Sequence, residues 1–183
     1  MKNTDIIIPE IDNKFEKFDI DKFDLEKENI FIKENDFYIK RMNQSFGFAK
    51  HLVKENSFFS ILKLYFKNSF IKEKGISFNN GSEYGVWYKF DEQGNLIEEI
   101  DTDKGYDFDW KQVVHYCEKN KIELTKGYET SGFQTTIYKE ESEEGHKTWV
   151  ITYQFSGDQL IELTLDGITG KELNKKKLEF VNH

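Results

Sequence analysis

Residues 85–100 read GVWYKF (85–90), DEQGN (91–95) and LIEEI (96–100), two apolar segments around a polar turn. Aromatic and β-branched residues dominate the first segment and the second contains two isoleucines, and such residues favour strands. Gly94 can take the positive φ that a tight turn demands, because it has no Cβ. This stretch therefore predicts a β-hairpin.

Similar apolar runs, each bounded by turn residues, occur on both sides of this hairpin. They predict strands at 29–34, 36–42, 46–53, 57–67, 70–78, 132–139, 148–155, 159–165 and 171–180. The run 148–155 shows the clearest period of two, because Trp149, Ile151, Tyr153 and Phe155 alternate with Thr148, Val150, Thr152 and Gln154. Short runs with turn signals between them are typical of consecutive antiparallel hairpins.

One segment, 109–120, has the pattern of an amphipathic helix instead. Asp109 is a good N-cap, and Gln112 three residues later can complete a capping box. The apolar positions follow the i, i+3, i+4, i+7 spacing of one helix face. They are Trp110, Val113, Val114 and Cys117. We expect this helix to pack on the sheet.

The length of 183 residues fits a single domain. We expect a single β-rich α+β domain over 29–183, an antiparallel sheet with one main helix packed on it. Residues 1–28 are rich in acidic residues and lack a regular period, which predicts an irregular N-terminal arm. Its Phe15, Phe18 and Phe23 can anchor the arm to the body.

The charge balance is acidic, with 26 Lys and Arg against 34 Asp and Glu and a formal net charge of −8. Binding to a nucleic-acid backbone requires clustered cations, so we expect no nucleic-acid partner. A basic protein surface is the natural counterpart, because complementary potentials raise the encounter rate and reject wrong partners.

Cysteine usage and the N-terminal residues bear on the compartment. The single Cys117 can form no intrachain disulfide, which favours a reducing compartment and predicts a cytoplasmic protein. Only three consecutive apolar residues, 6–8, precede Pro9, too few for a signal-peptide core or a membrane span. We therefore expect no membrane association.

No catalytic or metal-binding set stands out in the sequence. His115 and Cys117 are two apart on the predicted helix and so point to different faces, which argues against a thiol nucleophile. The acidic run 101–109 suggests calcium, but it lacks the distal Glu of an EF-hand loop and its Gly105 comes one place early. We expect no catalytic residue, no metal and no cofactor, although a carboxylate pair could still converge in the fold.

Two acidic loops and one aromatic pair are the candidates for partner binding. The loop 139–147 is either a solvated hairpin tip or a patch for a basic partner, in which Glu side chains stand in for substrate phosphates. The aromatic pair is an interface anchor if exposed and a core feature otherwise. The candidate residues are Asp101, Asp103, Asp107, Glu140, Glu141, Glu143, Glu144, Trp87 and Tyr88.

The stretch 85–101, GVWYKFDEQGNLIEEID, resembles the repeat of YwqK-type antitoxin proteins, which are related to MORN repeats. It shares a Gly, an aromatic pair, a D-x-x-G-x-L turn and an exit strand, and a degraded copy covers about 57–80. The continuation 101–110, DTDKGYDFDW, is similar to small proteins encoded beside toxins in Bacteroidetes genomes. A weaker likeness, LTLDGITGKEL at 163–173, is to the closing hairpin of PepSY-type domains.

The resemblance covers about 57–122 and implies an immunity protein of a contact-dependent or type VI secretion toxin. Such a protein is no enzyme; it binds and neutralises a cognate toxin, here one with a basic surface. Two alternatives stay open: a small hydrolase or transferase with a carboxylate-based site, and a structural or adaptor module built from hairpin repeats. Exposed sheet edges also allow a homodimer.

Overall fold

A computed structural model describes residues 6–157 and 159–179 of the chain. Two compact units are present, and each is described by itself. Unit 1 comprises the residues up to 79 together with 83–102 and 126–128, and unit 2 comprises 80–82, 103–125 and the residues from 129 onward. Both units contain residues of the range 29–183. The sequence predicts a single domain over that range, and this assignment stays a prediction.

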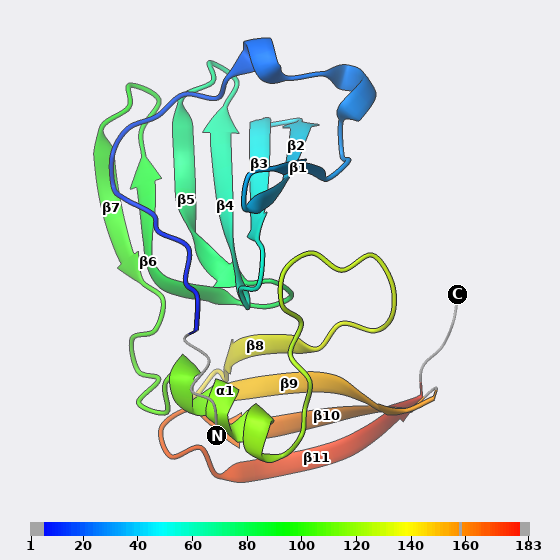
Figure 1. The fold of residues 1–183 in the computed structure, drawn as a ribbon. Helices are drawn as coiled ribbons and strands as arrows, with labels where there is room; N and C mark the ends of the chain where they lie inside the picture. Colours follow the sequence, from blue (N-terminus) through cyan, green and yellow to red (C-terminus); the bar gives the residue numbers. More distant parts are fainter. Residues whose placement is uncertain (1–5, 158, 180–183) are drawn as a thin grey trace. The chain divides into compact units, whose positions relative to one another are not determined.

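Unit 1 contains a seven-stranded antiparallel sheet in which each strand pairs with the next along the chain (Figure 1). The strands are β1 Ile32–Glu34, β2 Phe37–Gln44, β3 Gly47–Lys54, β4 Phe59–Phe66, β5 Ile71–Phe78, β6 Glu83–Phe90 and β7 Leu96–Asp101. This order confirms the prediction of consecutive hairpins. The hairpin predicted at 85–100 is β6–β7, and Gly94 in its turn has φ +89°.

The N-terminal arm, residues 6–28, contains two short 3-10 turns, Ile20–Lys22 and Leu25–Lys27, and crosses one face of this sheet (dark blue in Figure 1). Phe18 is buried and stacks on Phe48 of β3, with 4.6 Å between ring centroids. Phe23 meets the edge of the same ring at 5.9 Å, and Phe15 lies 4.9 Å from Phe70. All three phenylalanines that the sequence offered as anchors therefore contact the sheet or its hairpins.

Unit 2 contains a four-stranded antiparallel sheet in the order β11-β10-β9-β8 and the helix α1, Trp110–Lys119. The strands are β8 Thr136–Glu141, β9 Lys147–Ser156, β10 Gln159–Asp166 and β11 Glu172–Glu179. One face of the sheet carries Trp149, Ile151, Leu163 and Leu165, all with no exposed surface. The fold class is α+β, as the sequence predicted.

The helix begins at the capping box that the sequence predicts. The Asp109 side chain accepts a hydrogen bond from the backbone N–H of Gln112, and the Gln112 side chain accepts one from the backbone N–H of Asp109. All four predicted apolar positions of the helix are buried. The Trp149 indole donates to the carbonyl of Phe108 at 2.8 Å, which fixes the start of the helix to strand β9.

None of the helices in residues 6–157 and 159–179 has the length and apolar character needed to cross a membrane.

Candidate functional site

Three loops of unit 2 meet at one end of its sheet, and we call them the three-loop cluster: residues 103–108, 140–147 and 166–170. The Tyr106 hydroxyl donates to the Glu140 carbonyl at 3.1 Å. The backbone N–H of Gly167 donates to the Lys147 carbonyl at 2.8 Å, and that of Phe108 donates to the Gly167 carbonyl at 3.0 Å. Backbone and side-chain hydrogen bonds thus hold the three loops together.

Two of the predicted acidic residues serve inside this cluster. Asp103 forms an ion pair with Lys139, whose side chain is only 9% exposed, and Glu141 pairs with Lys147 at 3.0 Å. Both ammonium groups also lie over the Tyr106 ring, at 5.2 and 5.1 Å from its centroid. Burial, together with the neighbouring carboxylates, raises the pKa of Tyr106 to about 12, so its hydroxyl stays a proton donor at neutral pH.

Four other predicted residues of the cluster, Asp107, Glu140, Glu143 and Glu144, are exposed. None of them forms an ion pair with another residue in the described part of the chain. Their charge is therefore directed at solvent and available to a partner. Asp101, by contrast, belongs to unit 1, where it ends β7 opposite Val86.

The cluster also contains a pair that sequence reasoning missed. His146 Nε2 lies 2.8 Å from Asp166 Oδ2, and the other Asp166 oxygen accepts hydrogen bonds from Ile168 and Thr169. These bonds, first that of His146, hold the pKa of Asp166 well below its usual range. The D-G-x-T-G turn was visible in the sequence, but nothing local pointed to a histidine 20 residues earlier.

The predicted aromatic pair lies in unit 1. Trp87 is 3% exposed, its indole N–H donates to the Ile76 carbonyl at 2.9 Å, and its ring lies over Gly75. Tyr88 is half-buried and packs against the core cluster formed by Phe18, Tyr65, Ile71 and Phe90. Trp87 is therefore a core residue, the other reading that the sequence allowed, whereas a part in partner binding for the half-buried Tyr88 stays a prediction.

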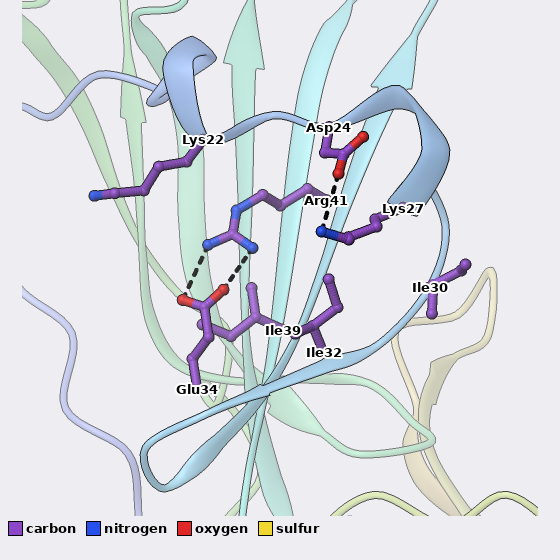
Figure 2. Close-up of a pocket in the computed structure, with 8 residues that line it drawn as sticks. All are labelled: Lys22, Asp24, Lys27, Ile30, Ile32, Glu34, Ile39 and Arg41. Atoms are coloured by element: carbon purple, nitrogen blue, oxygen red, sulfur yellow. Dashed lines mark hydrogen bonds and ion pairs between the residues drawn. The ribbon is translucent and has the colours of Figure 1, made fainter.

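Unit 1 contains a pocket of about 360 Å³ beside β1 and β2. Its lining combines three apolar side chains with charged ones: Ile30, Ile32, Ile39, Lys22, Lys27, Arg41, Asp24 and Glu34. Figure 2 shows the Arg41–Glu34 pair between Lys22 on one side and the Asp24–Lys27 pair on the other. The sequence did not point to this site, because only the fold brings side chains of the arm, β1 and β2 together around one cavity.

The Arg41 guanidinium binds Glu34 through two hydrogen bonds, of 2.8 and 3.1 Å, and holds the pKa of Glu34 below its usual range. A carboxyl that donates a proton in catalysis needs a raised pKa. The hydrolase or transferase alternative predicts a pocket lined by polar groups with perturbed pKa values. In this pocket the pKa of Glu34 is shifted downward, so Glu34 stays ionised.

Four cations next to this pocket stand directly opposite one another on β2, β3, β4 and β5. We call them the cation row: Arg41, Lys50, Lys63 and Lys74. The arm supplies carboxylates to two of them, since Glu16 binds Lys63 at 2.8 Å and Asp12 binds Lys74 at 3.1 Å. The arm is thus held to the sheet by charge as well as by its phenylalanines.

Cys117 has no exposed surface, and burial raises the pKa of its thiol to about 12, whereas His115 is exposed. The thiol is therefore protonated at neutral pH and packs as a core residue. Over the described ranges, no three or more His, Cys, Asp or Glu side chains are placed to hold a metal ion together.

Comparison with models of known protein families, with curated proteins and with solved structures found no match for this chain.

Proposed function

We propose that this chain is an immunity protein that binds and neutralises a cognate bacterial toxin through the three-loop cluster of unit 2. The observation that carries the proposal is the set of four exposed carboxylates, Asp107, Glu140, Glu143 and Glu144, on loops held together by hydrogen bonds. The hairpin at 85–101, with its resemblance to antitoxin repeats, supports the same reading. In this proposal the protein acts in the cytoplasm and carries no catalytic activity.

Charge and rigidity both favour binding by the three-loop cluster. Carboxylates form their strongest hydrogen bonds with Arg and Lys side chains, so they complement a basic toxin surface. Loops that are already ordered lose less conformational entropy on binding than flexible ones. The net charge of −8 adds long-range attraction, which raises the association rate at low salt.

Lys139 and Lys147 have a structural part in this proposal. Each neutralises one carboxylate of the cluster, Asp103 and Glu141 respectively, and so limits repulsion where the loops approach. Asp166 is bound by His146, and Asp107, Glu140, Glu143 and Glu144 then face a partner without an ion pair to another residue in the described part of the chain.

The test is co-expression with the product of the gene next to that of this chain, which the proposal expects to be the toxin, using two matched variants. The cluster variant carries Asp107→Asn, Glu140→Gln, Glu143→Gln and Glu144→Gln. The control removes the same charge at four exposed carboxylates outside the cluster, Glu10, Glu92, Glu118 and Glu129, each changed to Gln.

We expect the wild type and the control to protect cells and to form a complex, and the cluster variant to bind at least about tenfold more weakly, with a reduced dependence on salt. No complex between the wild type and the toxin would refute the immunity function. Equal binding by both variants would refute the assignment of the interface to the three-loop cluster.

A further inference from the structure

Lys50 occupies the centre of the cation row, opposite Arg41 on one side and Lys63 on the other. Both neighbours have carboxylate partners, Glu34 at 2.8 Å and Glu16 at 2.8 Å. Lys50 itself is half-buried, and its ammonium group forms no ion pair or hydrogen bond with any residue in 6–157 or 159–179. It is the member of the row that no carboxylate of the described residues contacts directly, although Glu34 and Glu16 attract it from a longer distance.

The charges of the row do not balance. Its four cations meet three carboxylates, Glu34, Glu16 and Asp12, which leaves one positive charge at Lys50. A partly buried charge without a partner is costly. Burial, then Arg41 and Lys63, lower the pKa of Lys50, while Glu34 and Glu16 act in the opposite direction, so an anion bound at Lys50 would raise this pKa.

The pocket of unit 1 offers room for such an anion to carry an apolar group. Arg41 lines the pocket, whereas Lys50 is outside the lining and is the neighbour of Arg41 on β3. Residues directly opposite on antiparallel strands have Cβ atoms about 5 Å apart, so an anion bound to Arg41 is within reach of the long Lys50 side chain. Arg41 uses two N–H groups for Glu34, and a guanidinium has about five. Ile30, Ile32 and Ile39 supply the apolar wall.

We propose that unit 1 binds a small oxyanion with a short apolar tail, its carboxylate or phosphate head at Lys50 and Arg41 and its tail against the three isoleucines. The pocket volume of about 360 Å³ lies at the lower end for small-ligand sites, which suits a tail of a few carbons. This site is separate from the toxin-binding proposal and does not depend on it.

The experiment uses the full chain and four probes. Hexanoate and hexyl phosphate carry both head and tail, hexanol carries only the tail, and inorganic phosphate carries only the head. Binding is measured by calorimetry, and the Lys50 ammonium is followed by side-chain NMR across pH. We expect hexanoate, hexyl phosphate or both to bind at least about tenfold more tightly than hexanol and to raise the Lys50 pKa.

Which anion binds tells a carboxylate ligand from a phosphate ligand. Lys50→Met keeps the length of the side chain and removes its charge, and it should weaken anion binding by about tenfold. Lys40→Met is the matched control, because Lys40 precedes Arg41 on β2, points to the opposite face of the sheet and changes the net charge equally.

Two outcomes would overturn the proposal: hexanoate and hexyl phosphate that bind no better than hexanol, or a Lys50→Met variant that binds them as well as the wild type. The pH-dependent NMR signal of the wild type decides the question by itself if Lys50→Met does not fold. In that case a Lys50 pKa unmoved by both anions refutes the site.

Discussion

Lys74 places an ammonium group inside unit 1, where its side chain is only 2% exposed. Its Nζ donates to Asp12 Oδ1 at 3.1 Å and to the Lys14 carbonyl at 2.7 Å, both on the arm. Changing Asp12 to Asn leaves this cation with neutral acceptors alone. Breaking a buried ion pair costs about 3–5 kcal/mol. Asp12 is 56% exposed, so water screens the pair and we expect a loss of about 1–2 kcal/mol in the free energy of unfolding.

Two further variants make this expectation specific. Lys74→Met removes the buried charge and keeps most of the side-chain volume, so it should cost less than Asp12→Asn, under about 1 kcal/mol. Adding Asp12→Asn to Lys74→Met should then cost no more than about 0.5 kcal/mol, because no buried cation remains. Lys14→Met is the control, since this side chain is 83% exposed and 3.9 Å from Asp12, and it should change stability by less than about 0.5 kcal/mol.

Urea unfolding of these proteins at neutral pH measures each term. If Lys74→Met is the most destabilised single variant and Asp12→Asn matches the wild type, then Asp12 does not stabilise the buried Lys74 ammonium.

The pH dependence of the free energy of unfolding tests the same ion pair. The hydrogen bond from Lys74 holds the pKa of Asp12 below its usual range, so its contribution is complete above the unfolded pKa of about 3.9 and is lost as the pH falls through the lower folded value.

Other predictions concern single positions. A Cβ at Gly75 would lie 2.2 Å from the Trp87 ring, so Gly75→Ala should cost about 1–3 kcal/mol in chemical unfolding and shift the Trp fluorescence; an unchanged midpoint would contradict this. Cys117 should react with a thiol reagent only as the protein unfolds, because it is buried and its pKa is raised to about 12; rapid labelling of the native protein would show otherwise. His146→Gln should raise the pKa of Asp166, because the hydrogen bond from His146 is the largest cause of the lowered pKa. Carboxyl NMR measures this pKa, and an unchanged value would show that the bond from His146 does not lower it.

Local pattern was enough to predict most of the secondary structure. The turn around Gly94, the capping box of Asp109 and Gln112 and the period of two in β9 are signals within a few residues of each other, and each element formed where its signal lay. The α+β class followed from the same signals. The division into two sheets did not, because strand runs of equal quality say nothing about which neighbours pair.

The candidate acidic residues show the same limit at the level of side chains. Asp103 and Glu140 lie far apart in the sequence, and only the fold brings their loops together. The fold also pairs Asp103 with Lys139, so its charge is neutralised inside the unit. The sequence allowed Trp87 to be either an interface anchor or a core residue. In the structure its ring lies over Gly75 and is buried, so Trp87 belongs to the core. Exposure is a property of the packed chain, so composition cannot assign it.

The amino-acid sequence thus determines the hairpins, the helix and the acidic balance, because turn chemistry, side-chain period and charge are local quantities. Tertiary structure alone aligns Arg41, Lys50, Lys63 and Lys74, since each comes from a different strand and only the register of the sheet puts them opposite one another. The described part of the arm, residues 6–28, then supplies carboxylates to Lys63 and Lys74 and no direct ion pair to Lys50. That uneven pairing depends on contacts between distant segments, and no local pattern encodes it.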